Sequence, residues 1–215
     1  MNTDLSARVV LATESMAWFS TAGASGWRKL LAQIDSETAR ATSMVKYAPG
    51  DSLNPPLQTQ GEEILVLEGT LTDGQATYSA GAYLRNPPGS NSPFHTTQGC
   101  ELFVKRYPFD SDDTDVVQID TANSPWVPGL VPELGVMPLH QHRHEQASLV
   151  RWKPDTYFQP HAHVGGEEIL VLSGVFEDEH GRYPAGTWIR SPHMSRHKPF
   201  SREGCTIYVK TGHLA

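Results

Sequence analysis

The sequence is poor in cysteine and contains no long apolar run. Its only cysteines, Cys100 and Cys205, are too few for a disulfide framework and lack the paired spacing of a zinc-thiolate motif. The longest apolar stretch near the N-terminus, Val9 to Ala12, is far shorter than a signal-peptide core, and no segment approaches the roughly 18 apolar residues that span a bilayer. We therefore expect a cytoplasmic protein with no membrane partner and with both cysteines buried as small residues.

Positive charge is also scarce. The formal net charge is −7, and the 17 lysines and arginines form no run and no helical stripe. Such a chain has no general electrostatic attraction to phosphate backbones, so nucleic acid is not an expected partner. Hydrophobic residues make up 38% of the 215 residues and there is no low-complexity segment, which predicts a folded globular protein.

The strongest signal is an internal repeat. The sequence GEEILVLEG at residues 61–69 recurs as GEEILVLSG at residues 166–174, an offset of 105 residues. Without a gap, the same offset aligns Tyr47 with Trp152, Tyr78 with Tyr183, Arg85 with Arg190, and Cys100 with Cys205. A match of this length between two halves indicates a duplication.

Each copy has the pattern of a β protein. Short apolar runs such as Ile64 to Leu67 are bounded by Gly, Pro, Asn or Asp at intervals of about 8–12 residues. Residues 157–163 alternate with the period of a strand whose two faces differ. Helix is expected, at most, over Trp27 to Gln33. The sequence therefore predicts an all-β fold with two tandem jelly-roll barrels from an internal duplication.

The repeat also predicts the domain boundaries. We expect an N-terminal lobe over residues 1–110, a C-terminal lobe over residues 124–215, and a linker over residues 111–123. The linker lies in a segment rich in aspartate, which is typical of a connection between compact units.

The C-terminal copy contains a set of residues suited to a metal. His161 and His163 are two residues apart, so on a strand both imidazoles point to one face. A turn at Gly165-Gly166 would place Glu167 beside them, and His197 would arrive from a separate strand. Three imidazoles and one carboxylate suit divalent zinc, iron, nickel, manganese or cobalt, and on an octahedral ion they would leave two positions open.

The N-terminal copy lacks this set. The offset maps the four candidate ligands to Pro56, Gln58, Glu62 and Ser92. One carboxylate alone cannot hold a metal tightly, so we expect the N-terminal lobe to bind none and a single ion to bind per chain.

Other polar residues have weaker signals. Glu168 has the opposite strand parity to Glu167, which favours a surface or inter-lobe salt bridge over a metal ligand. His140, His142 and His144 also alternate and could chelate a metal from one strand face, but an exposed strand or loop is the favoured interpretation. His193 lies four residues before His197, in the expected loop at the pocket mouth, and a role in proton transfer is left open there.

The ligand pattern resembles the cupin superfamily, whose first motif has two histidines and a glutamate and whose second supplies the last histidine. More narrowly, HAHVGGEEILVLSGVFEDEHGRYPAGTWIRSPHMSRHKP resembles the cupin-like domain of the ChrR anti-sigma factors. The resemblance covers most of Thr42 to Tyr107 and Ala147 to Gly212, and implies metal binding by His161, His163, Glu167 and His197. Those anti-sigma factors also carry a helical domain with a histidine and two cysteines on zinc, and we expect no counterpart of it within these 215 residues.

The resemblance leaves two functions open. The first is a sensory or regulatory module that holds zinc, with iron, nickel or manganese as alternatives, and reports a small-molecule ligand to a regulatory protein partner. The second is a non-haem metal dioxygenase acting on a diketone or a hydroxyaryl ketone, for which the sequence identifies no catalytic residue. Homodimerisation is open in both cases. The residues expected to line the pocket are Tyr157, Phe158, Trp188, Arg190 and Met194.

Overall fold

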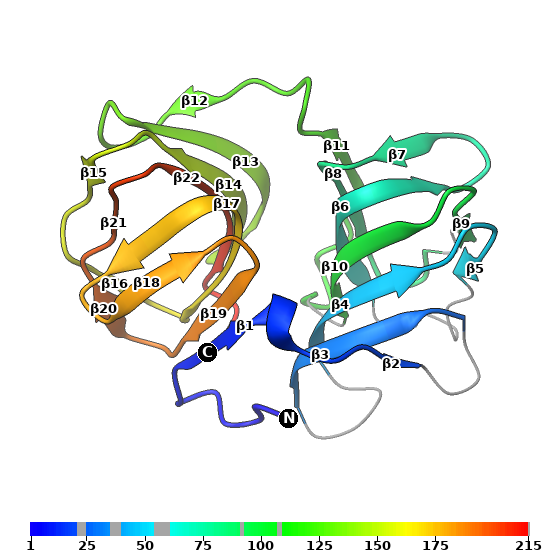
Figure 1. The fold of residues 1–215 in the computed structure, drawn as a ribbon, viewed down its shortest axis with the longest axis horizontal. Coiled ribbons are helices and arrows are strands. Elements are labelled where there is room, and N and C mark those ends of the chain that lie inside the picture. Colours follow the sequence, from blue (N-terminus) through cyan, green and yellow to red (C-terminus); the bar gives the residue numbers. More distant parts are fainter. Residues whose placement is uncertain (21–24, 35–39, 54–60, 91–92, 107–108, 215) are drawn as a thin grey trace. The chain divides into compact units, whose positions relative to one another are not determined.

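The chain folds into two compact units, each built almost entirely of antiparallel strands. The computed structural model describes residues 1–20, 25–34, 40–53, 61–90, 93–106 and 109–214. The first unit contains residues 1–3 and 16–124, and the second contains residues 4–15 and 125–215. The expected all-β fold with two tandem barrels is confirmed (Figure 1). No helix in the described part of the chain has the length and apolar character needed to cross a bilayer.

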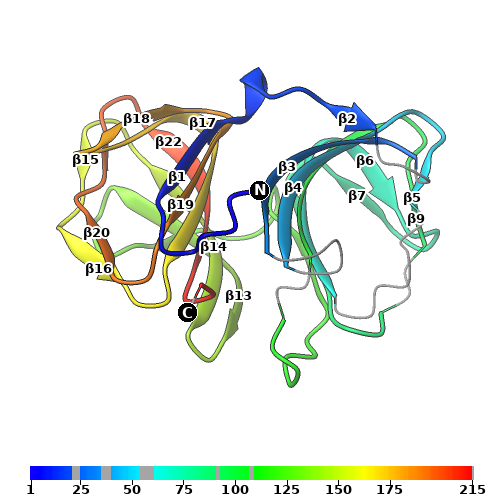
Figure 2. The same ribbon diagram turned by 90° about the horizontal axis from the view of Figure 1, so that it is seen from below.

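The first unit is a curved sheet whose central strands are long and buried. Its path runs β11-β8-β6-β10-β4-β3-β2, with β5, β7 and β9 pairing at its margin. Figure 2 shows the curvature of β3, β4 and β6. The strands are β2 (Phe19–Ser20), β3 (Trp27–Gln33), β4 (Ala41–Tyr47), β5 (Ser52–Leu53), β6 (Glu62–Thr72), β7 (Thr77–Ser79), β8 (Ala82–Asn86), β9 (Phe94–His95), β10 (Cys100–Arg106) and β11 (Val117–Asp120).

The second unit repeats the strand order of the main sheet, and it also contains a two-stranded sheet. Its main path runs β1-β19-β17-β22-β14-β13-β12, and among the described residues β16 and β20 pair with each other in the two-stranded sheet. Its elements are β1 (Val9–Ala12), the short 3-10 helix η1 (Thr13–Ser15), β12 (Val127–Pro128), β13 (Leu134–His142), β14 (Glu145–Trp152), β15 (Thr156–Tyr157), β16 (His161–His163), β17 (Glu167–Asp178), β18 (Gly181–Pro184), β19 (Thr187–Ser191), β20 (Ser195–His197), β21 (Phe200–Ser201) and β22 (Cys205–Thr211).

One edge strand of each main sheet lies outside the repeat copy that supplies its partner strand. In the second unit β1 pairs with β19 so that Val9 lies opposite Arg190 (Figure 1). In the first unit β11 pairs with β8 so that Val117 lies opposite Arg85, the repeat equivalent of Arg190. Strand β1, which precedes the first copy in the sequence, therefore belongs to the sheet of the second unit. Strand β11, which precedes the second copy, belongs to the sheet of the first unit. The segment 111–123, expected as a linker, contains β11, and residues 4–15 pack within the second unit.

The expectation of a helix at Trp27 to Gln33 is wrong, because these residues form β3. The strand pairs with β4 along its length and carries a register shift between Leu30 and Ala32. The shift puts Leu31 and Ala32 in succession into the buried interior, which gives a cluster of apolar residues that imitates a helical period in the sequence.

Each unit has its own apolar core. In the first unit the core includes Ile64, Val66, Leu84 and Leu102, and in the second it includes Ile169, Val171, Ile189 and Ile207. Cys100 and Cys205 are free thiols within these cores, each 5% exposed, as expected from the sequence.

Candidate metal centre

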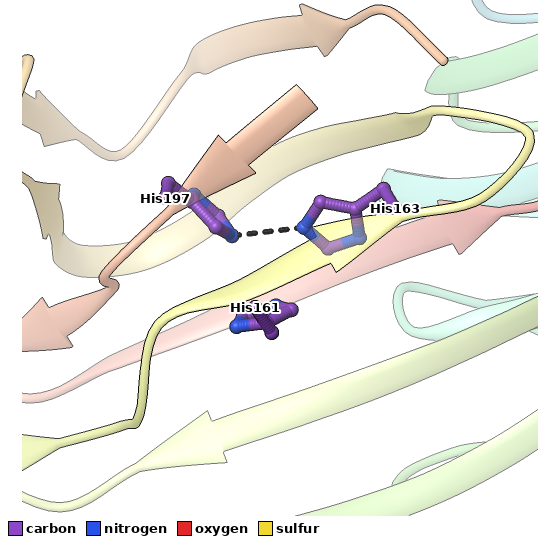
Figure 3. Close-up of side chains that lie close together, drawn as sticks. All are labelled: His161, His163 and His197. Carbon is purple, nitrogen blue, oxygen red and sulfur yellow. Dashed lines mark hydrogen bonds between the residues drawn. The ribbon is translucent and has the colours of Figure 1, made fainter. Parts of the chain in front are cut away.

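Two short strands bring the three candidate histidines together. In the pairing of β16 with β20, His161 lies opposite His197 and His163 lies opposite Ser195. Because His161 and His163 are two residues apart, both imidazoles lie on the face of this ribbon that also carries His197 (Figure 3). One nitrogen from each of the three rings lies within 4.8 Å of the other two, a spacing that one metal ion could bridge.

A glycine turn then brings Glu167 to the same place. Gly165 has a φ of +77°, and a Cβ there would lie 2.6 Å from the Cα of Gly212, so only glycine fits without strain. The amide of Gly165 donates to Nδ1 of His193, which fixes the turn from outside. The chain enters β17 at Glu167, whose Oε1 lies 3.5 Å from Nε2 of His163 and whose Oε2 lies 3.8 Å from Nε2 of His197.

The burial, protonation and hydrogen bonding of Glu167 and His163 favour a bound cation. Glu167 is 5% exposed, burial raises its pKa to about 7, and within the described residues its Oε2 accepts no hydrogen bond. Burial, together with the neighbouring rings of His197 and His161, lowers the pKa of His163 to about 3, so that this imidazole is neutral at physiological pH. A buried carboxylate oxygen that has no hydrogen-bond donor among the described residues, beside the neutral imidazole of His163, is the environment that a divalent ion would complete.

The tautomer of His161 also fits metal binding. Its Nδ1 lies 3.0 Å from the carbonyl oxygen of Gln159. Since a carbonyl only accepts, Nδ1 must carry the hydrogen, and Nε2 is left with its lone pair for a metal. Burial lowers the pKa of His161 as well, which keeps that lone pair available.

The sequence analysis did not identify Asp178, which lies directly behind His197. Its Oδ2 is 3.6 Å from Nδ1 of His197, on the side of the ring opposite the cluster. Burial opposes the charge of Asp178, but the nearby His197, hydrogen bonds from Tyr183 and the backbone, and Arg8 together lower its pKa to about 2. An aspartate placed behind a ligating histidine fixes the ring orientation in many metal sites. Its only sequence signal was its place in a hairpin shared by both copies.

The histidine cluster opens on an apolar cavity of about 330 Å³ within the second unit. The aliphatic and aromatic part of its lining includes Leu134, Val150, Trp152, Ile169, Phe176 and Ile207, whereas Gln146, Ser148 and Thr211 are polar. Among the described residues that line it, none is lysine or arginine. The cavity therefore suits a small, largely apolar molecule with a donor atom at the cluster.

Only one of the five expected lining residues, Phe158, lines this cavity. Trp188 lies opposite Leu170 and Arg190 opposite Glu168, and both side chains are buried without lining the cavity. Tyr157 and Met194 have exposed fractions of 54% and 49% and do not reach the cavity.

The weaker candidates have other surroundings. Glu168 has the parity opposite to Glu167, as expected, but it is buried and its Oε1 lies 3.4 Å from Nε2 of His213. Strand β13 ends at His142 and Arg143 has a φ of 51°, so the alternation that would align three imidazoles stops before His144.

Of the first-copy equivalents, Glu62 is buried, with Oε1 3.5 Å from Nδ2 of Asn86. Pro56, Gln58 and Ser92 lie outside the described residues.

A sequence family matches both halves of the chain. The profile of the ChrR cupin-like domain matches residues 6–110 and again residues 114–215. Comparison with curated proteins gives no match.

Solved structures share the fold at low sequence identity. A candidate dioxygenase from Nostoc punctiforme is 16% identical with a TM-score of 0.82, and the alignment covers 97% of this chain and 84% of that one. Protein Ylba from E. coli is 16% identical with a TM-score of 0.74, covering 97% of this chain and 92% of that one. A salicylate 1,2-dioxygenase from Pseudaminobacter salicylatoxidans is 10% identical with a TM-score of 0.60, covering 80% and 70%.

Proposed function

The chain belongs to the family of ChrR cupin-like domains, and from this premise we propose that it is a metal-binding regulatory module. The observation that carries the proposal is the grouping of three imidazoles with a buried carboxylate oxygen that accepts no hydrogen bond within the described residues. In this proposal His161, His163, Glu167 and His197 hold one divalent ion in the second unit.

Zinc is the ion that we favour, with iron, nickel and manganese as alternatives. Nitrogen and oxygen donors of this kind bind all of these ions, and availability decides between them. When bound, a divalent ion supplies Lewis acidity that can polarise an oxygen atom of a ligand. The chain itself contributes the imidazoles of His161 and His163, whose pKa values are lowered by burial, so that their lone pairs stay available.

The cavity is the proposed site of the signal. A small molecule could place an oxygen donor at the histidine cluster and its apolar part against Trp152, Phe158 and Ile169. Since no lysine or arginine is found among the described lining residues, those walls would not stabilise a second anionic group away from the cluster. Occupation of this cavity would then be reported to a regulatory protein partner.

The alternative function is a non-haem dioxygenase that acts on a diketone or hydroxyaryl ketone. It is supported by the apolar cavity beside the histidines and by the dioxygenase descriptions of two structural neighbours. The neighbours share the fold at 16% and 10% identity, which argues for architecture and leaves chemistry to the residues of the site.

Reconstitution with iron separates the two functions. The metal-stripped protein is loaded with ferrous iron or with zinc, and oxygen uptake is followed with acetylacetone and with 2′-hydroxyacetophenone. The regulatory proposal predicts retained zinc and no uptake above that of free iron with either compound. Uptake that depends on iron loading and is lost in His163→Ala would contradict it and support the dioxygenase.

A further inference from the structure

The two carboxylate oxygens of Asp178 have different partners. Oδ1 accepts from the backbone amides of His180 and Gly181 and from the hydroxyl of Tyr183, at 2.8, 3.0 and 2.7 Å. These contacts close the hairpin between β17 and β18. Oδ2 faces the guanidinium of Arg8 at 3.1 Å and Nδ1 of His197 at 3.6 Å. One oxygen therefore serves the hairpin and the other faces the histidine cluster.

The first unit contains the same hairpin, and among the described residues its aspartate has a different set of contacts. Asp73 is the repeat equivalent of Asp178, and its Oδ1 accepts from the amides of Gln75 and Ala76. Its Oδ2 accepts from the hydroxyl of Tyr78, so that both oxygens serve the turn. Closing the hairpin thus explains Asp73 fully, but it does not explain why Oδ2 of Asp178 points at His197.

Arg8 reaches Asp178 from the far end of the sequence. It immediately precedes β1, the strand that completes the sheet of the second unit by pairing with β19. Its guanidinium donates to Oδ2 of Asp178 and, at 2.8 Å, to the hydroxyl of Tyr183. The side chain of Arg8 is 30% exposed, whereas that of Asp178 is 2% exposed. The buried carboxylate is therefore charge-balanced by a residue of the N-terminal segment.

We propose that Asp178, held by Arg8, is a positioning residue for His197, so that the N-terminal segment completes the metal centre of the second unit. The inference rests on the metal binding proposed above. With its Nδ1 facing a carboxylate, His197 keeps its hydrogen on that nitrogen and directs the Nε2 lone pair toward Glu167 and His163. Because Arg8 holds the carboxylate in place, docking of β1 and binding of the ion stabilise each other.

This coupling works in both directions. If docking of β1 improves metal affinity, then metal binding must stabilise docked β1 by the same factor. Metal binding would thereby alter how firmly β1 is docked. The N-terminal segment lies outside the cavity and could carry the signal of the proposed regulatory function.

The first test compares two matched variants, Asp178→Asn and Asp73→Asn. Asparagine keeps an oxygen for the turn amides in both hairpins but removes the charge. We expect Asp178→Asn to weaken zinc or cobalt affinity about 10–100-fold, measured by chelator competition, and to alter the visible spectrum of the cobalt form. Asp73→Asn should leave both unchanged. Thermal unfolding of the metal-free proteins identifies any general loss of stability.

The second test uses Arg8→Gln, with Arg182→Gln as its control at an exposed arginine whose partners are Glu177 and Glu203. Arg8→Gln should weaken metal affinity by less than Asp178→Asn, and the double variant should be no weaker than Asp178→Asn alone, because Arg8 acts through Asp178. Metal addition should slow amide exchange of Val9 to Ala12 in the native chain and have no such effect in Asp178→Asn.

The outcomes distinguish this inference from the proposed function. A native chain that binds no metal would overturn both. A native chain that binds metal, but whose affinity and cobalt spectrum are the same in Asp178→Asn, would overturn the positioning role alone. Purely additive losses in the double variant, or exchange in β1 that ignores metal, would show that Arg8 and Asp178 only stabilise the fold.

Discussion

At the scale of single residues, Glu167 is poorly suited to the metal-free protein. Its side chain is buried, and no described donor satisfies Oε2. Burying such an oxygen without a hydrogen bond costs about 1–3 kcal/mol, and more if it is charged. Its neighbour Glu168 is equally buried but has His213 beside it. Glu167 therefore destabilises the metal-free site and would be stabilised by a bound ion, as expected of a metal ligand.

This contrast predicts opposite effects of two adjacent substitutions. Glu167→Gln removes a buried charge, so the melting temperature of the metal-free protein should rise by about 2–4 °C for each kcal/mol gained, while metal affinity falls more than about tenfold. Glu168→Gln should lower the melting temperature and leave metal affinity unchanged. Calorimetry and chelator competition measure the two quantities. If Glu167→Gln lowered stability and kept full affinity, Glu167 would be a structural residue.

At the scale of elements, the edge strands β1 and β11 are each held by an equivalent threonine hydrogen bond that follows the strand. The hydroxyl of Thr13, after β1, donates to the carbonyl of Gly186 at 2.7 Å. The hydroxyl of Thr121, after β11, donates to the carbonyl of Gly81 at 2.6 Å. Gly81 and Gly186 are repeat equivalents, so the duplication includes the fastening of each strand to the sheet that it completes.

The symmetry predicts local and mirrored effects of Thr13→Val and Thr121→Val. Each variant loses one hydrogen bond, worth about 1 kcal/mol, which corresponds to amide exchange about fivefold faster in the strand that it fastens. Thr13→Val should accelerate Val9 to Ala12 and spare Val117 to Asp120, and Thr121→Val should do the reverse. Hydrogen exchange read by mass spectrometry measures both. Equal acceleration of both strands in either variant would contradict independent fastening.

The strands also show which parts of the fold and of the site could be predicted from the sequence. The repeat and the alternation of polar and apolar residues predicted two β units, and parity correctly put Glu167 and Glu168 on opposite faces. Strand β3 was missed because a register shift disturbs its alternation. The partners of β1 and β11 could not be predicted, since local pattern does not determine which sheet an edge strand joins. Asp178 was missed for a similar reason, because Arg8 reaches it across 170 residues of sequence.

At the scale of the whole molecule, the two units share a duplicated fold but differ in the side chains available to bind a metal. Both units share the order of their main strands, the hairpin aspartate and the fastened edge strand. Within the described residues, the cluster of three histidines is found in the second unit, where the paired strands β16 and β20 carry them. The proposed metal site, the cavity and the proposed signal therefore belong to the second unit, and we expect the first unit to bind no metal.

The central claim is one metal ion per chain, held by His161, His163, Glu167 and His197. Elemental analysis of the protein after stripping and reloading with zinc tests it most directly, with the His161→Ala, His163→Ala double variant as the comparison. The account predicts one equivalent of zinc for the native chain and close to none for the variant, with both proteins folded by circular dichroism. Two equivalents in the native chain, or undiminished zinc in the variant, would contradict it.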